Sequence, residues 1–260
     1  MSETKEQFYK LARPDGFDFY TGRTINYREH IGGIARPPKR GKPHLCSDTV
    51  IHASRDPNDC FIGASIPCSA YLVEGKPYVK DDNKCGFKQL RVIKELDPKE
   101  LFQWDYELAC NPVHPFKIKP PKITKKHLAL LRQWDSVRHS ARGSVWYSVW
   151  DSAWYSVWGS VGYSVWASAW DSVGGSVWNS ARDSVGHSVW DSVGDSAWGY
   201  LGFMFKDAIE DWKYVNHKKG EYPFQPAVDL WNMGLVPSFD GNVWRLHGGK
   251  NAEILWKEKP

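Results

Sequence analysis

The N-terminal third of the chain holds a thiol and an imidazole at a spacing that could support covalent catalysis. Cys46 and His52 stand six residues apart in the stretch LCSDTVIHAS. A cysteine is an effective nucleophile when a histidine takes its proton and a third group orients that histidine. The stretch supplies no such third group, so we favour a buried cysteine beside a histidine whose hydrogen bonds are satisfied.

Four polar residues on separate strand-like stretches form a second candidate site. Tyr20, His52, Tyr71 and Glu74 are similar in type to the histidine, tyrosine and glutamate that ADP-ribosyltransferases use from separate strands. The resemblance implies an enzyme in the N-terminal domain, with His52, Tyr71 and Glu74 as its catalytic residues. We keep this enzyme as the alternative to a protein without catalytic activity.

Other common site signatures are missing from the sequence. It contains no GxGxxG or GxxxxGK[ST] phosphate loop and no HExxH zinc motif. The basic stretch ARPPKRGKPHL is typical of a solvated loop. An odd number of cysteines without a CxxC pair favours free thiols over disulfides or a zinc site. These cysteines are Cys46, Cys60, Cys68, Cys85 and Cys110. We expect no cofactor and no metal.

Charge and hydropathy predict a soluble globular protein. The 34 basic and 30 acidic residues leave a net charge of +4, which indicates no nucleic-acid partner. The N-terminus lacks the apolar run of a signal peptide, and no stretch reaches the roughly 18 apolar residues of a membrane span. We expect a cytoplasmic location, in a bacterium or a phage-infected cell, and no membrane partner.

An uninterrupted array of sixteen tetrapeptides occupies residues 135–198. Serine fills the second place of every unit, and the third place is only valine or alanine. The fourth place is tryptophan nine times, glycine four times and arginine three times. The chain has fifteen tryptophans, several times the ordinary usage, and nine of them lie in the array.

The period of the array favours strands over helices. An α-helix turns about 100° per residue, so a four-residue repeat drifts by about 40° per unit and has no constant buried face. In a strand, four is a multiple of the two-residue pleat, so each class of side chain keeps its face. Units this short fold only when they stack, and the array therefore predicts a β-solenoid. A helical or a disordered array is the alternative.

The array resembles the pentapeptide-repeat proteins, which are right-handed square β-helices with small inward-facing residues. It departs from them because its units are one residue shorter and because valine or alanine fills the central place. Some members of that family mimic DNA, so the resemblance also implies a DNA-mimic inhibitor as an alternative. Six aspartates against three arginines in the array give too little negative charge for that role.

Exchange among tryptophan, arginine and glycine indicates that the fourth place faces outward, since no packed core accepts both an indole and a guanidinium. Such a face would bind a protein partner or a second copy of the chain. Drift of a duplicated DNA unit explains the same exchange, because the three codons can differ in one base, and both explanations stay open. The candidate binding residues are Trp146, Trp150, Trp154, Trp158, Trp166, Trp170, Trp178 and Trp190.

The chain is expected to be β-rich and α+β overall. Residues 1–120 read as a globular α+β domain, 121–134 as a linker helix that Thr124 caps, 135–198 as the solenoid and 199–260 as its C-terminal cap. The cap is expected to contain helices and a closing hairpin. Its predicted elements are a helix through Phe205, Ile209 and Trp212, a second helix over PAVDLWNMG, and a hairpin over NVWRLHGGKNAEILW.

Over nearly its whole length the chain is similar to uncharacterised phage and metagenome proteins. CSDTVIHAS, the SVWDSV-type array and GLVPSFDGNVWRLHGG carry the likeness, which implies a phage setting and no particular activity. We therefore predict a non-enzymatic interaction protein that presents a tryptophan-rich surface to a protein partner or, as a homodimer, to itself. The alternative is an N-terminal enzyme with the array as its spacer, and a small-molecule partner is left open.

Overall fold

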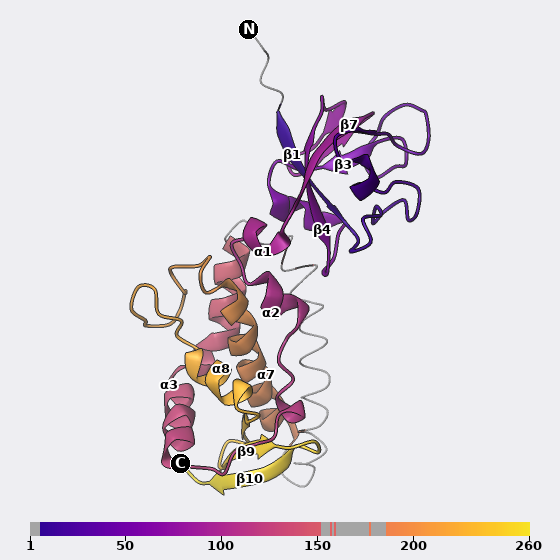
Figure 1. Cartoon of the computed structure of the whole chain (residues 1–260). Coiled ribbons are helices and arrows are strands. Elements are labelled where there is room, and N and C mark those ends of the chain that lie inside the picture. The colour runs from indigo at the N-terminus through magenta and orange to yellow at the C-terminus, as the bar shows by residue number, and fades with distance from the viewer. Residues whose placement is uncertain (1–5, 152–156, 158, 160–176, 178–185) are drawn as a thin grey trace. The chain divides into compact units, whose positions relative to one another are not determined.

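The computed structural model describes residues 6–151, 157, 159, 177 and 186–260 (Figure 1). These residues divide into two compact units. The N-terminal unit holds residues 6–106 together with Val157 and Gly159, and the helical unit holds the other described residues.

Two small antiparallel sheets form the N-terminal unit. Their strand orders are β1-β4-β7-β2 and β3-β6-β5. The backbones of Tyr9 in β1 and Ser54 after β3 exchange two hydrogen bonds of 2.8 and 3.0 Å, which join the sheets. The strands are β1 (Gln7–Ala12), β2 (Ile34–Ala35), β3 (Ile51–Ala53), β4 (Ser69–Glu74), β5 (Val79–Lys80), β6 (Cys85–Phe87) and β7 (Leu90–Leu96).

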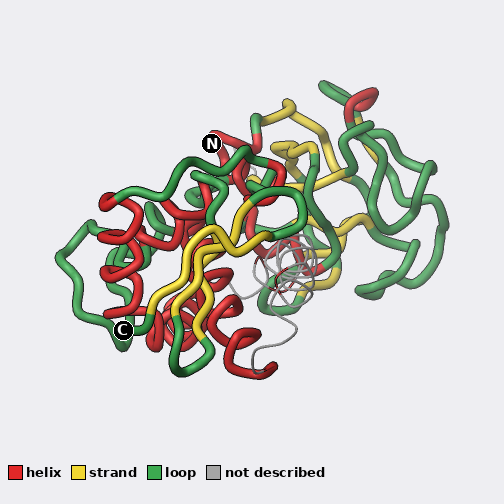
Figure 2. Tube along the Cα trace, turned by 90° about the horizontal axis from the view of Figure 1, so that it is seen from below, coloured by secondary structure: helices red, strands yellow, loops and turns green. Residues whose placement is uncertain are grey.

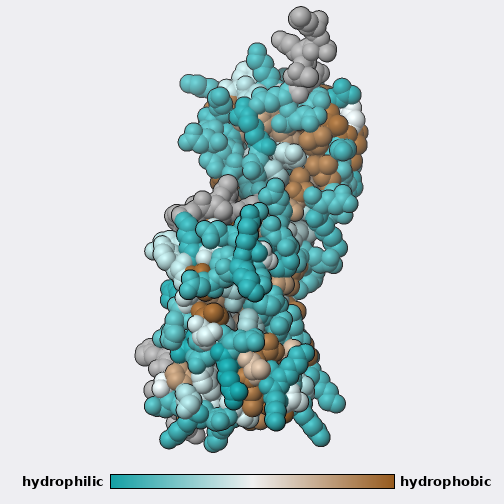
Figure 3. Space-filling model, turned by 90° about the vertical axis from the view of Figure 1, so that its left-hand side faces the viewer, coloured by the Kyte–Doolittle hydropathy of each residue, from teal (hydrophilic) through white to brown (hydrophobic). Residues whose placement is uncertain are grey.

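Aromatic rings dominate the core of the N-terminal unit. Phe8 and Phe87 meet edge to face with ring centroids 4.9 Å apart, and Tyr27 lies 5.8 Å from Tyr71. All four side chains are fully buried. Burying a phenylalanine contributes about 1.5–3 kcal/mol, so these contacts fix how β1, β4 and β6 pack. Figure 3 shows some hydrophobic residues gathered on the visible face of this unit, among hydrophilic ones.

Short helical turns connect the strands. Asp56 caps the 3-10 helix η2 (Pro57–Ile62) by accepting the N–H of Asn58, and Asp97 caps α1 (Pro98–Leu101) by accepting that of Lys99. A proline follows each cap, at the helical position that needs no N–H donor. The other short elements are η1 (Arg28–His30), α2 (Tyr106–Cys110) and η3 (Pro115–Lys117).

Helices and one three-stranded sheet form the helical unit. Helix α7 packs against α3, α8 and β8, and Figure 2 shows the strands of the sheet running side by side. No helix among the described residues is long and apolar enough to cross a bilayer. The elements are α3 (Lys125–Asp151), α7 (Gly186–Gly202), η6 (Phe203–Phe205), α8 (Gln225–Asn232), β8 (Val236–Phe239), β9 (Trp244–Gly248) and β10 (Glu253–Glu258).

The elements predicted on either side of the array are partly found. Helix α3 begins directly after Thr124, α8 covers most of the PAVDLWNMG stretch, and β9 pairs with β10 as the expected hairpin. The helix predicted through Phe205, Ile209 and Trp212 is wrong, because η6 ends at Phe205 and turns follow it. All three side chains are buried, so their spacing reflects burial in a turn-rich segment.

The β-solenoid predicted for residues 135–198 is also wrong. Residues 135–151 continue α3, and residues 186–198 form most of α7. Val157 and Val177 are α-helical, and Gly159 lies in a π-helical turn. No strand occurs among the described residues of the array. The described part of the chain has three small antiparallel sheets, none of which closes or stacks into a solenoid.

Helix α3 buries more than one place of the repeat. Arg138 is buried from the fourth place, Ala141 and Val145 from the third, and Ser144 and Ser148 from the second. Spacings of three and four residues connect these positions, as in any helix with one buried stripe. The solenoid prediction fails because a helix can bury such an array without an exact four-residue period. The third place is buried from Ala141 onward in the described units, and the place that joins it in the buried stripe changes from the fourth at Arg138 to the second at Ser144 and Ser148, as the drift of about 40° per unit allows.

The fourth place of the array therefore does not face outward throughout, which corrects that expectation. Trp146 is 38% exposed, whereas Arg138 is 8% exposed. The guanidinium of Arg138 lies 5.0 Å from the ring centroid of Phe239 and 5.3 Å from that of Trp244. Its Nε donates to a carboxylate oxygen of Asp135 at 3.1 Å. The buried charge is thus paired, and aromatic faces cover it.

Buried serines of the array bind C-terminal segments of the helical unit. Each hydroxyl accepts one N–H from a segment that follows the array in sequence. A buried N–H left without a partner costs about 1–3 kcal/mol, so these bonds fix the segments against the two helices. The pairs are Ser148 with the backbone N–H of Lys213 (3.0 Å), Ser192 with that of Phe239 (2.7 Å), and Ser196 with the indole N–H of Trp231 (3.2 Å).

Alanine substitutions at Gly202 and Gly143 should change stability in opposite directions. A Cβ at Gly202 would lie 2.6 Å from Cγ2 of Val145, whereas one at Gly143 in α3 has no atom within 4 Å. Overpacking costs about 1–3 kcal/mol, and replacing an uncrowded helical glycine by alanine gains about 1 kcal/mol. Urea unfolding followed by circular dichroism should show G202A less stable and G143A more stable than the wild type. Equal shifts would contradict the close approach of α3 and α7.

Candidate functional site

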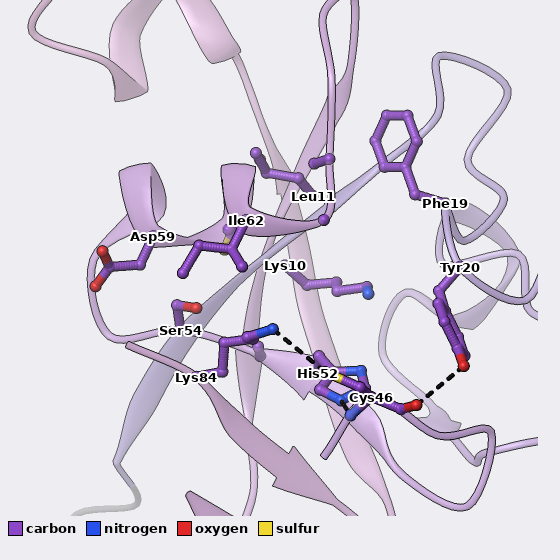
Figure 4. Close-up of a pocket in the computed structure, with 14 residues that line it drawn as sticks. Lys10, Leu11, Phe19, Tyr20, Cys46, His52, Ser54, Asp59, Ile62 and Lys84 are labelled. Carbon is purple, nitrogen blue, oxygen red and sulfur yellow. Dashed lines mark hydrogen bonds between the residues drawn. The ribbon is translucent and has the colours of Figure 1, made fainter. Parts of the chain in front are cut away.

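The N-terminal unit contains a pocket of about 250 Å³, which we call the Lys84 pocket. Strand β1, strand β3, η2 and the loops before β3 and β6 line it. Figure 4 shows Lys84 pointing toward Cys46, which lies next to His52. Its lining includes the polar residues Lys10, Tyr20, Cys46, His52 and Lys84 and the apolar residues Leu11, Phe19 and Ile62.

Cys46 is held in an uncommon backbone conformation. Its φ is 57°, in the left-handed region that few residues other than glycine adopt. Its N–H donates to Nε2 of His52 at 2.9 Å, and its carbonyl accepts the hydroxyl of Tyr20 at 3.0 Å. Such a conformation costs about 1–3 kcal/mol and persists where neighbours fix it. The thiol is exposed at the pocket, so the expectation of a buried cysteine is wrong.

His52 positions the backbone of Cys46 and does not act on its thiol. Because Nε2 accepts the N–H of Cys46, the neutral ring carries its proton on Nδ1. Burial, together with the charges of Lys10 and Lys84, lowers the pKa of His52 to about 4. The ring is therefore neutral near pH 7, and its acceptor nitrogen is occupied by the N–H of Cys46. The pair is not a nucleophile and base dyad.

Lys84 supplies a positive charge beside the thiol. Its Nζ lies 3.6 Å from Sγ of Cys46, and no carboxylate of the described chain forms an ion pair with it. The N–H of Lys84 donates to Asp81 at 2.6 Å, which closes the turn before β6 and fixes where the side chain starts. The ammonium group therefore stands where it can attract an anionic group that approaches the sulfur.

A buried ion pair supports the other side of the pocket. Nζ of Lys10 lies 2.6 Å from Oδ1 of Asp18, and both side chains are almost fully buried. Asp18 also accepts the hydroxyl of Tyr27 and the N–H groups of Tyr20 and Thr21. Burial raises the pKa of Asp18, but the charge of Lys10 and these hydrogen bonds more than offset it, so the net pKa lies well below its ordinary value.

The other four cysteines are less accessible than Cys46. All five are free, and Cys46 alone among them is exposed. The thiol of Cys60, which also lines the pocket, donates to the carbonyl of Tyr9 at 3.2 Å, and burial raises its pKa to about 11. Burial likewise raises the pKa of Cys85. Cys46 is therefore the thiol that small reagents reach most readily.

The four residues of the ADP-ribosyltransferase resemblance do not come together. His52 and Tyr20 line the Lys84 pocket, with ring centroids 6.2 Å apart. Tyr71 is fully buried in the core. Glu74 follows it by three positions on β4, on the opposite face of the sheet, and lines a separate groove with Arg91. A single substrate could not meet His52, Tyr71 and Glu74 at once.

Most of the predicted tryptophan surface falls outside the described part of the chain. Trp154, Trp158, Trp166, Trp170 and Trp178 are not described, and only the backbone helix is described for Trp150 and Trp190. Trp146 is partly exposed and meets Trp198 edge to face at 6.2 Å. Next to it in sequence, the exposed Tyr147 meets the exposed Tyr214 at 5.4 Å. These three exposed residues, Trp146, Tyr147 and Tyr214, form what we call the aromatic patch.

Sequence reasoning missed both lysines of the pocket. Lys10 alternates with apolar residues in FYKLA, and Lys84 stands in the polar turn DDNKCGF, so neither looks different from a surface lysine. The fold brings Lys84 to Cys46 across 38 residues of sequence. The one signal in the sequence is that Cys46 lies in the loop before β3 and Lys84 directly before β6, because β3 pairs with β6.

Comparisons with known proteins add no family to this geometry, because no protein-family model, no curated protein and no solved structure matches the chain. Among the described residues, no group of three or more histidine, cysteine or acidic side chains could hold a metal ion.

Replacing Asp18 should destabilise the N-terminal unit far more than replacing an exposed aspartate. D18N leaves the ammonium of Lys10 buried without its partner, which costs about 3–5 kcal/mol. The control is D48N, whose ion pair with Lys39 has the same length, 2.6 Å, but is exposed, so its unfolding free energy should hardly change. Chemical unfolding measures both variants.

The pH dependence of unfolding gives a second readout for the same pair. Because the folded state depresses the pKa of Asp18 below its ordinary value of 3.8, the stability that it contributes is fully present above that pH. It is lost as the pH falls further. The wild type should lose this contribution in acid, whereas D18N should not. Parallel pH profiles for the two proteins would contradict the role of the pair.

Proposed function

We propose that the N-terminal unit is a non-enzymatic binding module that takes a small anionic ligand in the Lys84 pocket. The observation that carries the proposal is the ammonium of Lys84, which faces the pocket without an ion-pair partner among the described residues. The second ammonium, on Lys10, is neutralised by Asp18. An anion in the pocket would provide the opposite charge that Lys84 lacks.

The apolar lining and the volume of the pocket indicate the chemical type and size of the uncharged part of the ligand. Leu11, Phe19 and Ile62 offer apolar surface, which favours a ligand with a short hydrocarbon part beside its charged group. A volume of about 250 Å³ is below the roughly 300 Å³ at which pockets for drug-sized molecules begin. We therefore propose short-chain carboxylates as the ligand class. The neutral His52 and the absence of a base on Cys46 support binding rather than turnover.

Titration with acetate and butanoate tests the proposal. Butanoate should bind more tightly than acetate, because its longer chain buries more apolar surface at about 0.8 kcal/mol per CH₂. Backbone amide NMR spectra should show the shifts concentrated at Cys46, His52 and Lys84. The variant K84Q should lose binding, whereas K94Q, which changes an exposed lysine of β7 away from the pocket, should keep it. Equal binding by both variants would refute an anion site at Lys84.

We propose a second role for the helical unit, in protein binding or self-association. It keeps the interaction role expected for the array, with helices in place of the solenoid. The aromatic patch supports it, because Trp146, Tyr147 and Tyr214 are 38%, 48% and 68% exposed. Exposed aromatic clusters are typical of protein interaction sites.

Size-exclusion chromatography with light scattering tests the second role. The variant W146R/Y147D uses residues that the array already accepts at its fourth and first places, so the helices should still form. If the aromatic patch mediates self-association, the wild type should form a dimer that dissociates on dilution, and the variant should be a monomer at every concentration. The same mass for both proteins would rule out self-association through this patch.

A further inference from the structure

We propose that Cys46 is a site of covalent modification, at which its sulfur bonds to small electrophiles that carry an anionic group. The inference rests on the proposed anion-binding role of the Lys84 pocket and adds a chemical step to it. Three observations carry it together. The thiol of Cys46 is exposed, the ammonium of Lys84 is 3.6 Å from its sulfur, and both line one pocket with apolar walls.

The backbone around Cys46 holds the sulfur in place for such a reaction. Both polar backbone groups of Cys46 are bonded to pocket side chains, the N–H to His52 and the carbonyl to Tyr20. The sulfur is therefore positioned without losing its solvent-exposed side. A nucleophile that is already fixed near the bound reactant loses little further freedom on reaction, which raises its effective concentration.

The charges that face Cys46 favour an anionic reactant. Lys84 is the nearest cation, and Asp18 neutralises Lys10. Two carboxylates lie nearby, but both are engaged. Asp59 accepts the side-chain amide of Asn83 at 3.1 Å, and burial raises its pKa, while Asp81 accepts the N–H groups of Asn83 and Lys84. Neither carboxylate forms an ion pair with Lys84 among the described residues, so its ammonium can attract the anionic group of the reactant.

The chemical class that fits is an α,β-unsaturated carboxylate. The thiol of Cys46 releases its proton to water, and its sulfur forms a bond to the β carbon as the carbon–carbon π bond breaks. The π electrons move to the α carbon, which takes a proton from the ammonium of Lys84, and water then returns a proton to the amine. All atoms and electrons are accounted for, so the step needs no oxidant or reductant. The product is a thioether on Cys46.

Two probes of nearly equal size but different charge test the inference. Iodoacetate and iodoacetamide both alkylate a thiolate, with a new bond from sulfur to carbon and loss of iodide with its electron pair. Peptide mass spectrometry follows the rate at each cysteine. Cys46 should be alkylated first among the five cysteines. The rate with iodoacetate divided by the rate with iodoacetamide should be roughly fivefold higher at Cys46 than for glutathione. A factor of this size is the effect of one unit charge about 4 Å away in water.

Two lysine variants test whether Lys84 causes the preference of Cys46 for iodoacetate. K84Q should lose the preference for iodoacetate at Cys46, and K94Q should keep it. Because K84Q could fold poorly, the wild type is also measured at low and high salt, where screening should reduce the iodoacetate preference at Cys46 and leave iodoacetamide unchanged. A ratio no higher than that of glutathione, or Cys46 reacting no faster than Cys60, would overturn the inference.

The variant C46S separates this inference from the proposed binding function. It cannot form the thioether but keeps Lys84 and the apolar walls. If C46S binds butanoate while wild-type Cys46 shows no preference for iodoacetate, the covalent step fails and the binding function stands. If C46S does not bind butanoate and the wild-type protein shows no preference either, both fail together.

Discussion

A four-residue sequence repeat cannot stay in register with a helix of 3.6 residues per turn, and the helical unit is organised around this mismatch. Along α3 the buried position passes from Arg138 in the fourth place through Ala141 in the third to Ser148 in the second. The second and fourth places must therefore tolerate both burial and exposure, while the third place stays buried from Ala141 onward in the described units. Serine in the second place and valine or alanine in the third suit these positions because they are small.

Burial of polar residues in this way has an energetic cost that the rest of the unit has to offset. Ser148, Ser192 and Ser196 accept hydrogen bonds from the segments that follow the array. The hydroxyl of Ser144 is buried without a hydrogen-bond partner among the described residues, and such a group costs about 1–3 kcal/mol. Burial also raises the pKa of Asp195 to about 6, even with Arg138 nearby. The helical unit therefore depends on apolar packing around α7, where Tyr200 and Trp231 stack at 5.0 Å.

The sequence predicts local elements better than it predicts the array or the pocket. Thr124, PAVDLWNMG and the Gly-Gly turn locate two helices and a hairpin, because caps and turns depend on neighbouring residues. The array misleads because a strict four-residue period suggests a strand, while the structure buries the third place together with a changing neighbour on the face of a helix. The sequence does not predict the Lys84 pocket, because Cys46 and Lys84 come together only through the pairing of β3 with β6. Cys46 and His52 are adjacent in space as their spacing allows, but the bond runs to the backbone.

The most direct test of this account is the Cα chemical shift of the array serines in the full chain. Ser144 and Ser148 in α3, and Ser192 and Ser196 in α7, occupy the same place of the repeat, so one residue type reports on both helices. The account predicts downfield Cα shifts, relative to random coil, at all four residues, as in α-helices. Upfield shifts at all four would indicate strands and would contradict the helical array on which this account depends.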